Sequence, residues 1–190
     1  MVVFNTKKTK CMLFNSAASP IIVDHVVELS GKRLEFVEQF TYLGHIISKT
    51  LSDNQDIDNQ NQKLCARGNM IARKFKMCSS EIKCMLFKTF CYTIYGSALW
   101  STFTMTTLNR FRVNYNNILR RLFNVPTWNS ASELFVRLRL RGFREQRRIS
   151  CYSLMQRVLH SENSMVQAVV HSDARGESSL WAYWDTVCRG

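Results

Sequence analysis

The residues with the clearest chemical potential are arginines, which gather in one short stretch of the sequence. Six of them lie within twelve residues, at Arg137, Arg139, Arg141, Arg144, Arg147 and Arg148. Two more, Arg120 and Arg121, come shortly before. A guanidinium group carries a planar set of N–H donors that matches a pair of phosphate oxygens. On a helix, one face would carry Arg144, Arg147 and Arg148, and another would carry Arg137 and Arg141. We therefore expect contacts to a nucleic-acid backbone.

The charge of the chain favours the same interpretation. Its 190 residues include 26 Lys and Arg against 14 Asp and Glu, which gives a formal net charge of +12. The excess is concentrated in residues 63–157, which hold 18 basic residues and only three acidic ones. Such a field attracts polyanions and releases their counterions on binding. A solvated cationic surface without a partner is the alternative, and nothing in the stretch indicates base-specific readout.

Carboxylates suited to metal-dependent catalysis are not found at the required spacing. Polymerase chemistry uses two metal ions held close together by carboxylates, but none of the six aspartates is adjacent to another. Asp53, Asp56 and Asp58 cluster ahead of a predicted helix, where the helix dipole favours acids. The seven cysteines form no C-x-x-C pair, and the histidines lie at no zinc-ligand spacing from them. We therefore expect no catalytic residue, no metal and no cofactor.

Two blocks near the start resemble a known family. They are Asn5-Thr6-Lys7-Lys8-Thr9-Lys10 and Phe40-Thr41-Tyr42-Leu43-Gly44-His45-Ile46-Ile47. Together they resemble the end of the palm in reverse transcriptases of non-LTR (LINE-type) retrotransposons, in which N-x-x-K-T-K precedes an F-x-Y-L-G block. A tyrosine-glycine pair at 95–96, followed by Trp100, adds to the resemblance, which covers about residues 4–160.

The resemblance implies a role for each block. The second block would be the primer grip, with Phe40, Tyr42, Leu43 and Gly44 at the 3′ end of a growing strand. Lys8 matches a lysine that approaches the triphosphate, and Lys10 ends the same motif. The helices that follow would form a thumb against the template–primer duplex. Two parts of the family pattern are missing. The chain lacks the aromatic-x-Asp-Asp turn that binds the metal ions in the RNA-directed DNA polymerases of the family. It also lacks the arginine that follows Asp-Ile in the family, because Asn-Gln-Asn-Gln occupies residues 59–62.

Hydrophobic patterning predicts the elements that position these residues. Strands are expected at 12–14, 21–29, 34–37 and 40–47, with a turn at 30–33. From residue 52 the period becomes helical, and one face carries Ile57, Leu64, Gly68, Ile71 and Phe75. The next helix begins at Ser80, with an expected apolar face of Ile82, Met85, Leu86, Phe90 and Ile94.

Three more helices follow in the pattern. The first spans about 106–123 on a stripe of Leu108, Phe111, Tyr115, Ile118, Leu119 and Leu122. Ser130 and Glu133 match a capping box that opens the next. The last begins near Phe143 and passes through Ile149, Tyr152, Met155 and Leu159. Residues 84–105 are apolar, but Lys88 and several hydroxyl groups favour a buried helix over a membrane span.

These elements predict an α+β fold, in which a small antiparallel β meander or hairpin precedes a mostly helical, thumb-like region. We place the end of the palm with its primer-grip hairpin at 1–50, the helical region at 51–163 and a weakly structured tail at 164–190. Two tryptophans of this tail, Trp181 and Trp184, are expected to pack on the nearest helix rather than to stack on bases.

The expected function is sequence-independent binding of RNA, DNA or a hybrid duplex by a truncated, basic reverse transcriptase fragment without polymerase activity. Two alternatives stay open: a host-retained module whose exposed apolar faces bind a protein partner, and a retrotransposon remnant without function. The first residues become polar too early for a signal peptide, and the odd number of cysteines is typical of a reducing compartment. We expect a nuclear or cytoplasmic protein without membrane association.

Overall fold

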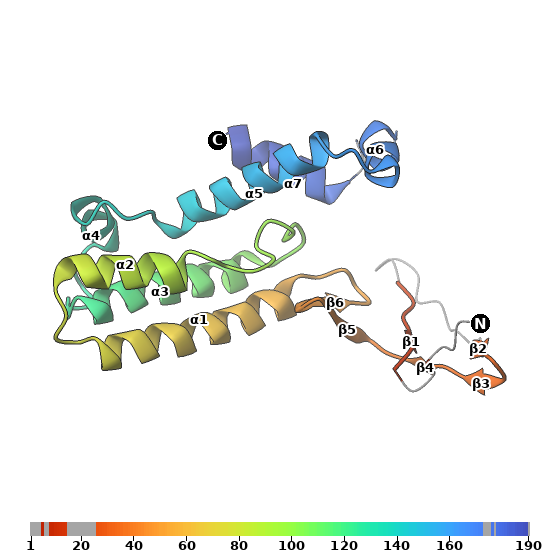
Figure 1. Cartoon of the computed structure of the whole chain (residues 1–190), viewed down its shortest axis with the longest axis horizontal. Helices are drawn as coiled ribbons and strands as arrows, with labels where there is room; N and C mark the ends of the chain where they lie inside the picture. The colour runs from red at the N-terminus through yellow and green to blue at the C-terminus, as the bar shows by residue number, and fades with distance from the viewer. Residues whose placement is uncertain (1–4, 6–7, 15–25, 173–175, 177, 190) are drawn as a thin grey trace. The chain divides into compact units, whose positions relative to one another are not determined.

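The computed structural model describes residues 5, 8–14, 26–172, 176 and 178–189. The backbone divides into two compact units, Met1–Asp56 and Ile57–Gly190. Short strands occupy the first unit, and seven helices follow from residue 54 onward in the described part of the chain (Figure 1). This is the predicted α+β class with a helical majority, and the division falls a few residues after the predicted boundary.

Two hairpins in the first unit turn on pairs of residues with positive φ. Strand β2 (Glu28–Leu29) pairs with β3 (Lys32–Arg33) through Ser30-Gly31, and β5 (Gln39–Tyr42) pairs with β6 (His45–Ser48) through Leu43-Gly44. Two consecutive positive φ angles give a type I′ turn, whose twist matches that of the flanking strands. The strand expected at 40–47 from patterning is therefore two strands of a hairpin, the element that the resemblance implies for this block.

The remaining pair of strands corrects the predicted meander. Strand β1 (Lys10–Cys11) pairs with β4 (Glu35–Phe36) in parallel, because a long connection between two strands does not impose the antiparallel direction that a tight turn imposes. Residues 12–14 do not form a strand. The turn expected at 30–33 consists of residues 30–31, and residues 32–33 belong to strand β3. Of the strand expected at 21–29, residues 21–25 lie outside the described residues.

Two long helices run side by side in the second unit. The contacts between α1 (Asn54–Lys74) and α3 (Met105–Leu122) advance together along both: Asp58 pairs with Arg110, Asn61 bonds to Asn114 at 3.1 Å, and Asn69 bonds to Arg121 at 2.8 Å. The helices are therefore parallel. Helix α2 (Ser80–Cys91), which follows α1 and precedes α3 in the sequence, runs in the opposite direction (Figure 1). The predicted apolar faces of α1 and α3 are confirmed, with full burial of Ile57, Leu64, Ile71, Phe111, Tyr115 and Leu119.

Gly68 allows the close approach of α1 to α3. A Cβ at this position would lie 2.5 to 2.6 Å from three side-chain carbons of Ile118, including both branches. We expect Gly68→Ala to lower the free energy of unfolding by about 1 kcal/mol, because overpacking costs about 1–3 kcal/mol and exceeds the ~1 kcal/mol that alanine gains in helix propensity. Chemical denaturation measures this change.

A double-mutant cycle distinguishes overpacking from any other effect of the added methyl group. In an Ile118→Ala background the space is vacant, so the same Gly68→Ala substitution is expected to stabilise the protein by about 1 kcal/mol. A destabilisation of equal size in both backgrounds would contradict the role given to this contact.

The predicted apolar face of helix α2 is confirmed only in part: Ile94, just beyond the helix, is buried, and Phe90 packs against the core. Its N-cap is Ser79, one residue before the predicted cap, and the Ser79 hydroxyl accepts from the backbone N–H of Ile82. Phe87 and Cys91 are buried, whereas Ile82 and Met85 are exposed. The helix carries apolar residues on almost every side, so periodicity alone does not select the buried one.

Two further helices carry most of the arginines. Helix α4 (Ala131–Arg137) begins at the predicted cap, where the Ser130 hydroxyl accepts from the N–H of Glu133. Helix α5 (Phe143–Leu159) starts as predicted, but its buried positions are Phe143, Arg147 and Cys151. Of the apolar residues through which the predicted helix passes, Met155 and Leu159 pack against an apolar cluster, whereas Ile149 and Tyr152 are exposed.

The segment predicted as a weakly structured tail contains two helices, α6 (Ser164–His171) and α7 (Ser179–Arg189). Both pack on α5, and their side chains form a second apolar cluster that includes Cys151, Val170, Trp181 and Trp184. The indole N–H of Trp184 donates to the carbonyl of Ala98 at 2.7 Å. The predicted packing of both tryptophans is confirmed. Across the described residues, every helix is too short or too polar to cross a bilayer.

Candidate nucleic-acid interface

The arginines at 137–141 are distributed by the way α4 ends. Arg139 has a φ of 51°, the N–H of Leu140 donates to the carbonyl of Phe135, and the N–H of Arg139 donates to that of Val136. These bonds form a Schellman motif, which closes a helix with one left-handed residue. Arg137 is thus the last helical residue, and Arg141 lies in the connection to α5. The predicted helical face shared by Arg137 and Arg141 does not exist, although both side chains are exposed.

The connection is fixed to the rest of the helical unit through Arg141. Its backbone N–H donates to the hydroxyl of Tyr92 at 2.6 Å, and its carbonyl accepts from the hydroxyl of Tyr115 at 3.1 Å. The Arg141 guanidinium lies 5.9 Å from the centre of the Tyr92 ring. The backbone bonds leave the side-chain N–H donors of Arg141 available to a ligand.

Arg147 does not belong to this surface. Only 5% of the residue is exposed, and its guanidinium lies among the rings of Trp100, Phe103, Phe143 and Tyr183, at 5.6, 5.3, 5.9 and 5.0 Å from their centres. Such an enclosure suits a cation, because each ring presents a negative face. The predicted face of Arg144, Arg147 and Arg148 therefore retains only its outer members, Arg144 and Arg148, which are exposed.

Arg120 and Arg121 point to different sides of α3. The Arg120 guanidinium donates twice to the carbonyl of Asn129, at 3.1 and 2.8 Å, and once to the amide oxygen of Asn117. Arg121 instead donates to Asn69 on α1. Only Arg120 faces the part of the unit that holds Arg137 and Arg144.

Sequence reasoning missed Arg112, which lines a hollow of about 310 Å³ together with Arg144. Asn116 and Ser132 add polar groups to it, and its apolar wall comes from Phe135, Val136, Leu140 and Phe143. The Nε of Arg112 is buried and has no hydrogen-bond partner among the described residues. A sequence signal existed, because residues 112, 116 and 120 lie at i, i+4 and i+8 on one flank of α3.

A second hollow, of about 330 Å³, lies between α5 and α7. It is lined by Arg144, Arg148, Glu145 and Tyr183, with Arg147 behind them. Arg148 is oriented by a bond from its Nε to the carbonyl of Val187 at 3.0 Å. Burial raises the pKa of Tyr183 to about 12, so its hydroxyl is neutral at physiological pH. The two hollows share Arg144 and Glu145, which are neighbours at the start of α5.

These side chains form what we call the arginine surface: Arg112, Arg120, Arg137, Arg139, Arg141, Arg144 and Arg148. In the described part of the chain none of them makes an ion pair with a carboxylate, and the one ion pair among the helices joins Arg110 to Asp58. The acids near these seven arginines are Glu145, which lines both hollows and accepts from the N–H of Gly142, and Glu133 on α4. The positive charge of the surface is therefore largely uncompensated.

The predicted primer-grip residues form the tip of the β5–β6 hairpin. Tyr42 is 59% exposed and Leu43 is 74% exposed, and Phe40 lies on the same strand as Tyr42 with its side chain also exposed. Leu43 and Gly44 have φ angles of 48° and 83°. A left-handed leucine is strained and glycine is not, so Gly44 permits the turn that presents Tyr42 and Leu43.

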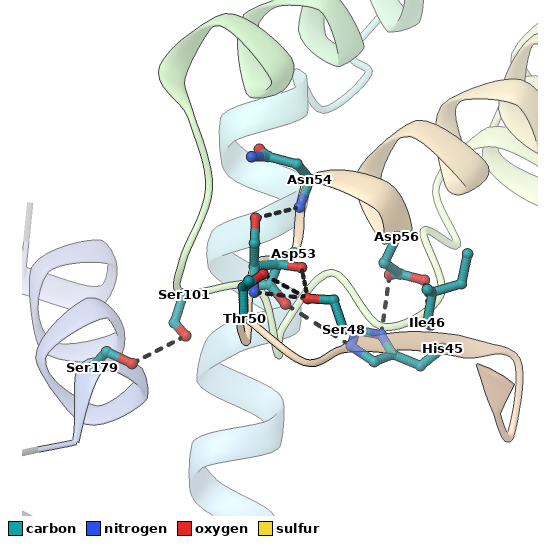
Figure 2. A network of polar contacts seen from close by, with 10 residues as sticks. His45, Ile46, Ser48, Thr50, Asp53, Asn54, Asp56, Ser101 and Ser179 are labelled. Carbon is teal, nitrogen blue, oxygen red and sulfur yellow. Dashed lines mark hydrogen bonds and ion pairs between the residues drawn. The ribbon is translucent and has the colours of Figure 1, made fainter. Parts of the chain in front are cut away.

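The base of this hairpin is fixed by a polar network (Figure 2). Asp56, which is fully buried, accepts from the N–H of Ile46 at 3.0 Å and pairs with Nδ1 of His45 at 3.0 Å. Asp53 lies 4.0 Å from Nε2 of the same histidine. The hydrogen bond to Asp56 raises the pKa of His45 above 6.5, although burial opposes it. Asp53 and Asp56 therefore have the structural role at the helix start that the sequence indicates.

The two lysines of the first block differ in availability. Lys8 is exposed, and its backbone N–H donates to the carbonyl of Asn5 at 3.0 Å. Lys10 forms an ion pair with Glu35 across the β1–β4 ladder, so its charge is already compensated. Lys7, in the same block, lies outside the described residues.

The buried cysteines are poorly suited to nucleophilic chemistry. Burial raises the pKa of Cys91 to about 12 and that of Cys151 to about 11, so both thiols are protonated at neutral pH and are weak nucleophiles. All seven cysteines are free. Within the described ranges, no three His, Cys, Asp or Glu side chains are placed to hold a metal ion.

Comparison of the chain with protein-family models, curated proteins and solved structures finds no match in any of the three.

Proposed function

We propose that the protein binds RNA, DNA or their hybrid without sequence specificity, through the arginine surface of the helical unit. The observation that carries the proposal is the set of exposed or half-buried guanidinium groups without carboxylate partners on α3, α4, α5 and the connection between α4 and α5. Phosphate oxygens supply the missing negative charge and match the guanidinium geometry. Backbone contacts of this kind position a nucleic acid without reading its sequence.

The exposed hairpin tip adds a second contact region in the first unit. Its resemblance to a primer grip supports binding near a strand end, and the resemblance of the helices to a thumb supports contact with a duplex. The 190 residues hold no adjacent aspartates, so we propose binding without polymerisation. The free cysteines support a reducing compartment, the nucleus or the cytoplasm.

Binding to nucleic acid is expected to depend steeply on salt and on three arginines. Arg137, Arg139 and Arg144 are exposed, and their side chains make no hydrogen bond or ion pair within the described residues, so we expect their replacement by glutamine to leave the fold intact. For the triple variant we expect affinity at about 100 mM salt to fall about a hundredfold, and the slope of log K against log salt to decrease by about 2 to 3, because each lost phosphate contact removes about 0.7–0.9. Fluorescence anisotropy with labelled duplexes of mixed sequence measures both quantities.

A second triple variant, with Arg73, Lys74 and Lys76 replaced by glutamine, removes the same net charge from the exposed end of α1 and the turn after it. It should change affinity and slope much less. Equal effects of the two triple variants would mean that only net charge matters, and absence of binding by the unaltered protein at 50 mM salt would refute the proposal.

A second candidate function, docking of a protein partner, is favoured by the exposed side chains of Tyr42 and Leu43 at the hairpin tip. Apolar association depends little on salt, whereas nucleic-acid binding weakens steeply between 50 and 200 mM. The salt titration therefore separates the two candidates.

A further inference from the structure

Trp128 is the large aromatic residue that the structure leaves most exposed. Its exposed fraction is 85%, and it belongs to neither apolar cluster. The other three tryptophans are buried in these clusters. An indole ring in water loses the apolar burial that usually stabilises it, so its exposure calls for a ligand that covers it.

The loop that carries Trp128 is held in one conformation. Helix α3 ends in a Schellman motif, in which Asn124 has a φ of 53° and the N–H of Val125 donates to the carbonyl of Arg120 at 2.8 Å. The N–H of Asn129 then closes a turn onto the carbonyl of Pro126 at 3.2 Å. The carbonyl of Asn129 accepts two bonds from the Arg120 guanidinium. The residues on both sides of Trp128 are thus fixed before any ligand arrives.

The surroundings of this loop are cationic and hollowed. Arg120 lies against the residue that follows Trp128, and a hollow of about 220 Å³ begins at that residue, Asn129. Arg137 lines the hollow, with Val125 and Leu134 as apolar wall and Glu133 as its one acid. An aromatic side chain next to a hollow lined by arginine is an arrangement found where single-stranded nucleic acids bind, because guanidinium groups contact the phosphates while the ring stacks on a base.

We propose that Trp128 stacks on an unpaired nucleobase of a single strand whose phosphates bind the arginine surface. This inference rests on the proposed function and specifies it: the preferred ligand has unpaired bases, as in a single strand or an overhang. A base within a duplex is already stacked on both faces and is not available to Trp128. Every nucleobase has a π face, so the contact adds affinity without adding sequence specificity.

The test compares a mixed-sequence 12-nucleotide single strand with the corresponding 12-base-pair duplex. Trp128→Ala should weaken binding of the single strand about 5-fold to 150-fold, the range that corresponds to one stacked base. Binding of the duplex should change less than about twofold. The salt slope should stay constant for both ligands, because tryptophan carries no charge. Trp128→Phe should restore part of the single-strand affinity.

The control is Met77→Ala, which truncates an apolar side chain that is 93% exposed on the α1–α2 connection. It should leave both affinities unchanged. If the unaltered protein binds neither ligand, the proposed function itself fails. If the unaltered protein binds both ligands with a normal salt slope and the Trp128→Ala variant has the same affinities, the stacking proposal is refuted, but binding by the arginine surface is not. An equal loss for single strand and duplex would also refute stacking on an unpaired base.

Discussion

Replacing Arg147 with alanine is expected to lower the free energy of unfolding of the helical unit by about 3 kcal/mol. The guanidinium is buried among four aromatic rings, and a desolvated cation–π contact contributes about 2 kcal/mol. Truncation also removes the packing of the arginine stem and leaves a cavity in the wall between the two apolar clusters. Denaturation with urea, followed by circular dichroism, measures the loss.

Two other substitutions at this position separate the charge from the volume. Arg147→Met keeps most of the volume and removes the cation, so its stability should lie between those of the alanine variant and the unaltered protein. Arg147→Lys keeps the charge but loses the planar group that stacks on rings, and it should also be intermediate. If the methionine variant is as stable as the unaltered protein, the cation–π contribution is absent.

Arg144→Ala is the matched control for these variants. It lies about one turn earlier on the same helix, but its side chain is exposed and makes no hydrogen bond or ion pair within the described residues. Its effect on stability should stay below about 0.5 kcal/mol, whereas nucleic-acid affinity should fall. A stability loss at Arg144 equal to that at Arg147 would contradict the distinction between the buried and the exposed arginine.

Replacing Asp56 with alanine is expected to detach the base of the β5–β6 hairpin from the start of α1. The change removes a fully buried carboxylate and leaves His45 and the N–H of Ile46 without the bonds that Asp56 provides. Breaking such a buried pair costs about 3–5 kcal/mol. The amide of Ile46 should therefore exchange with solvent at least about a hundredfold faster, as measured by NMR hydrogen exchange.

Asp58→Ala is the control for this substitution. Asp58 follows on the same helix, but it is half-exposed and pairs with Arg110 at the surface, where an ion pair contributes less than about 1 kcal/mol. Exchange at Ile46 should be unchanged in this variant. Similar acceleration in both variants would mean that any acid near the helix start suffices.

The same network gives the hairpin a pH dependence with a defined sign. Because Asp56 raises the pKa of His45 in the folded state, the stability contributed by protonated His45 is complete below pH 6.5 and is lost as the pH rises through the raised folded pKa. Protection of the Ile46 amide, corrected for intrinsic exchange, should fall over that window. In His45→Gln the dependence should disappear, because glutamine does not titrate.

The buried face of a helix could be predicted from the sequence where its apolar residues lie on one side only. Helix α3 alternates apolar and polar residues with a clear period, so its buried stripe follows from the sequence, as does the start of α4 at Ser130. Helix α2 is apolar on nearly all sides, and its buried face is decided by what packs against it. Helix α5 hides an arginine at a core position, which no hydrophobicity pattern predicts.

The sequence predicted which residue type forms the candidate site, but not how those side chains are arranged. The sequence predicts that arginines gather, but their orientation depends on the left-handed residue at Arg139, which breaks the expected helical face. Trp128 was missed because exposure of a tryptophan is a tertiary property. Trp181 and Trp184 have the same residue type within a short segment and are buried, through contacts with α5 and with Ala98 far along the chain.

The rings around Arg147 come from distant parts of the sequence, and this fixes an order of events during translation. Trp100, Phe103 and Phe143 are synthesised before or with the arginine, whereas Tyr183 follows it by more than thirty residues. Until α7 emerges from the ribosome, one side of the guanidinium must remain hydrated. Closure of the last ring over the guanidinium therefore comes after the other three ring residues and the arginine have been synthesised.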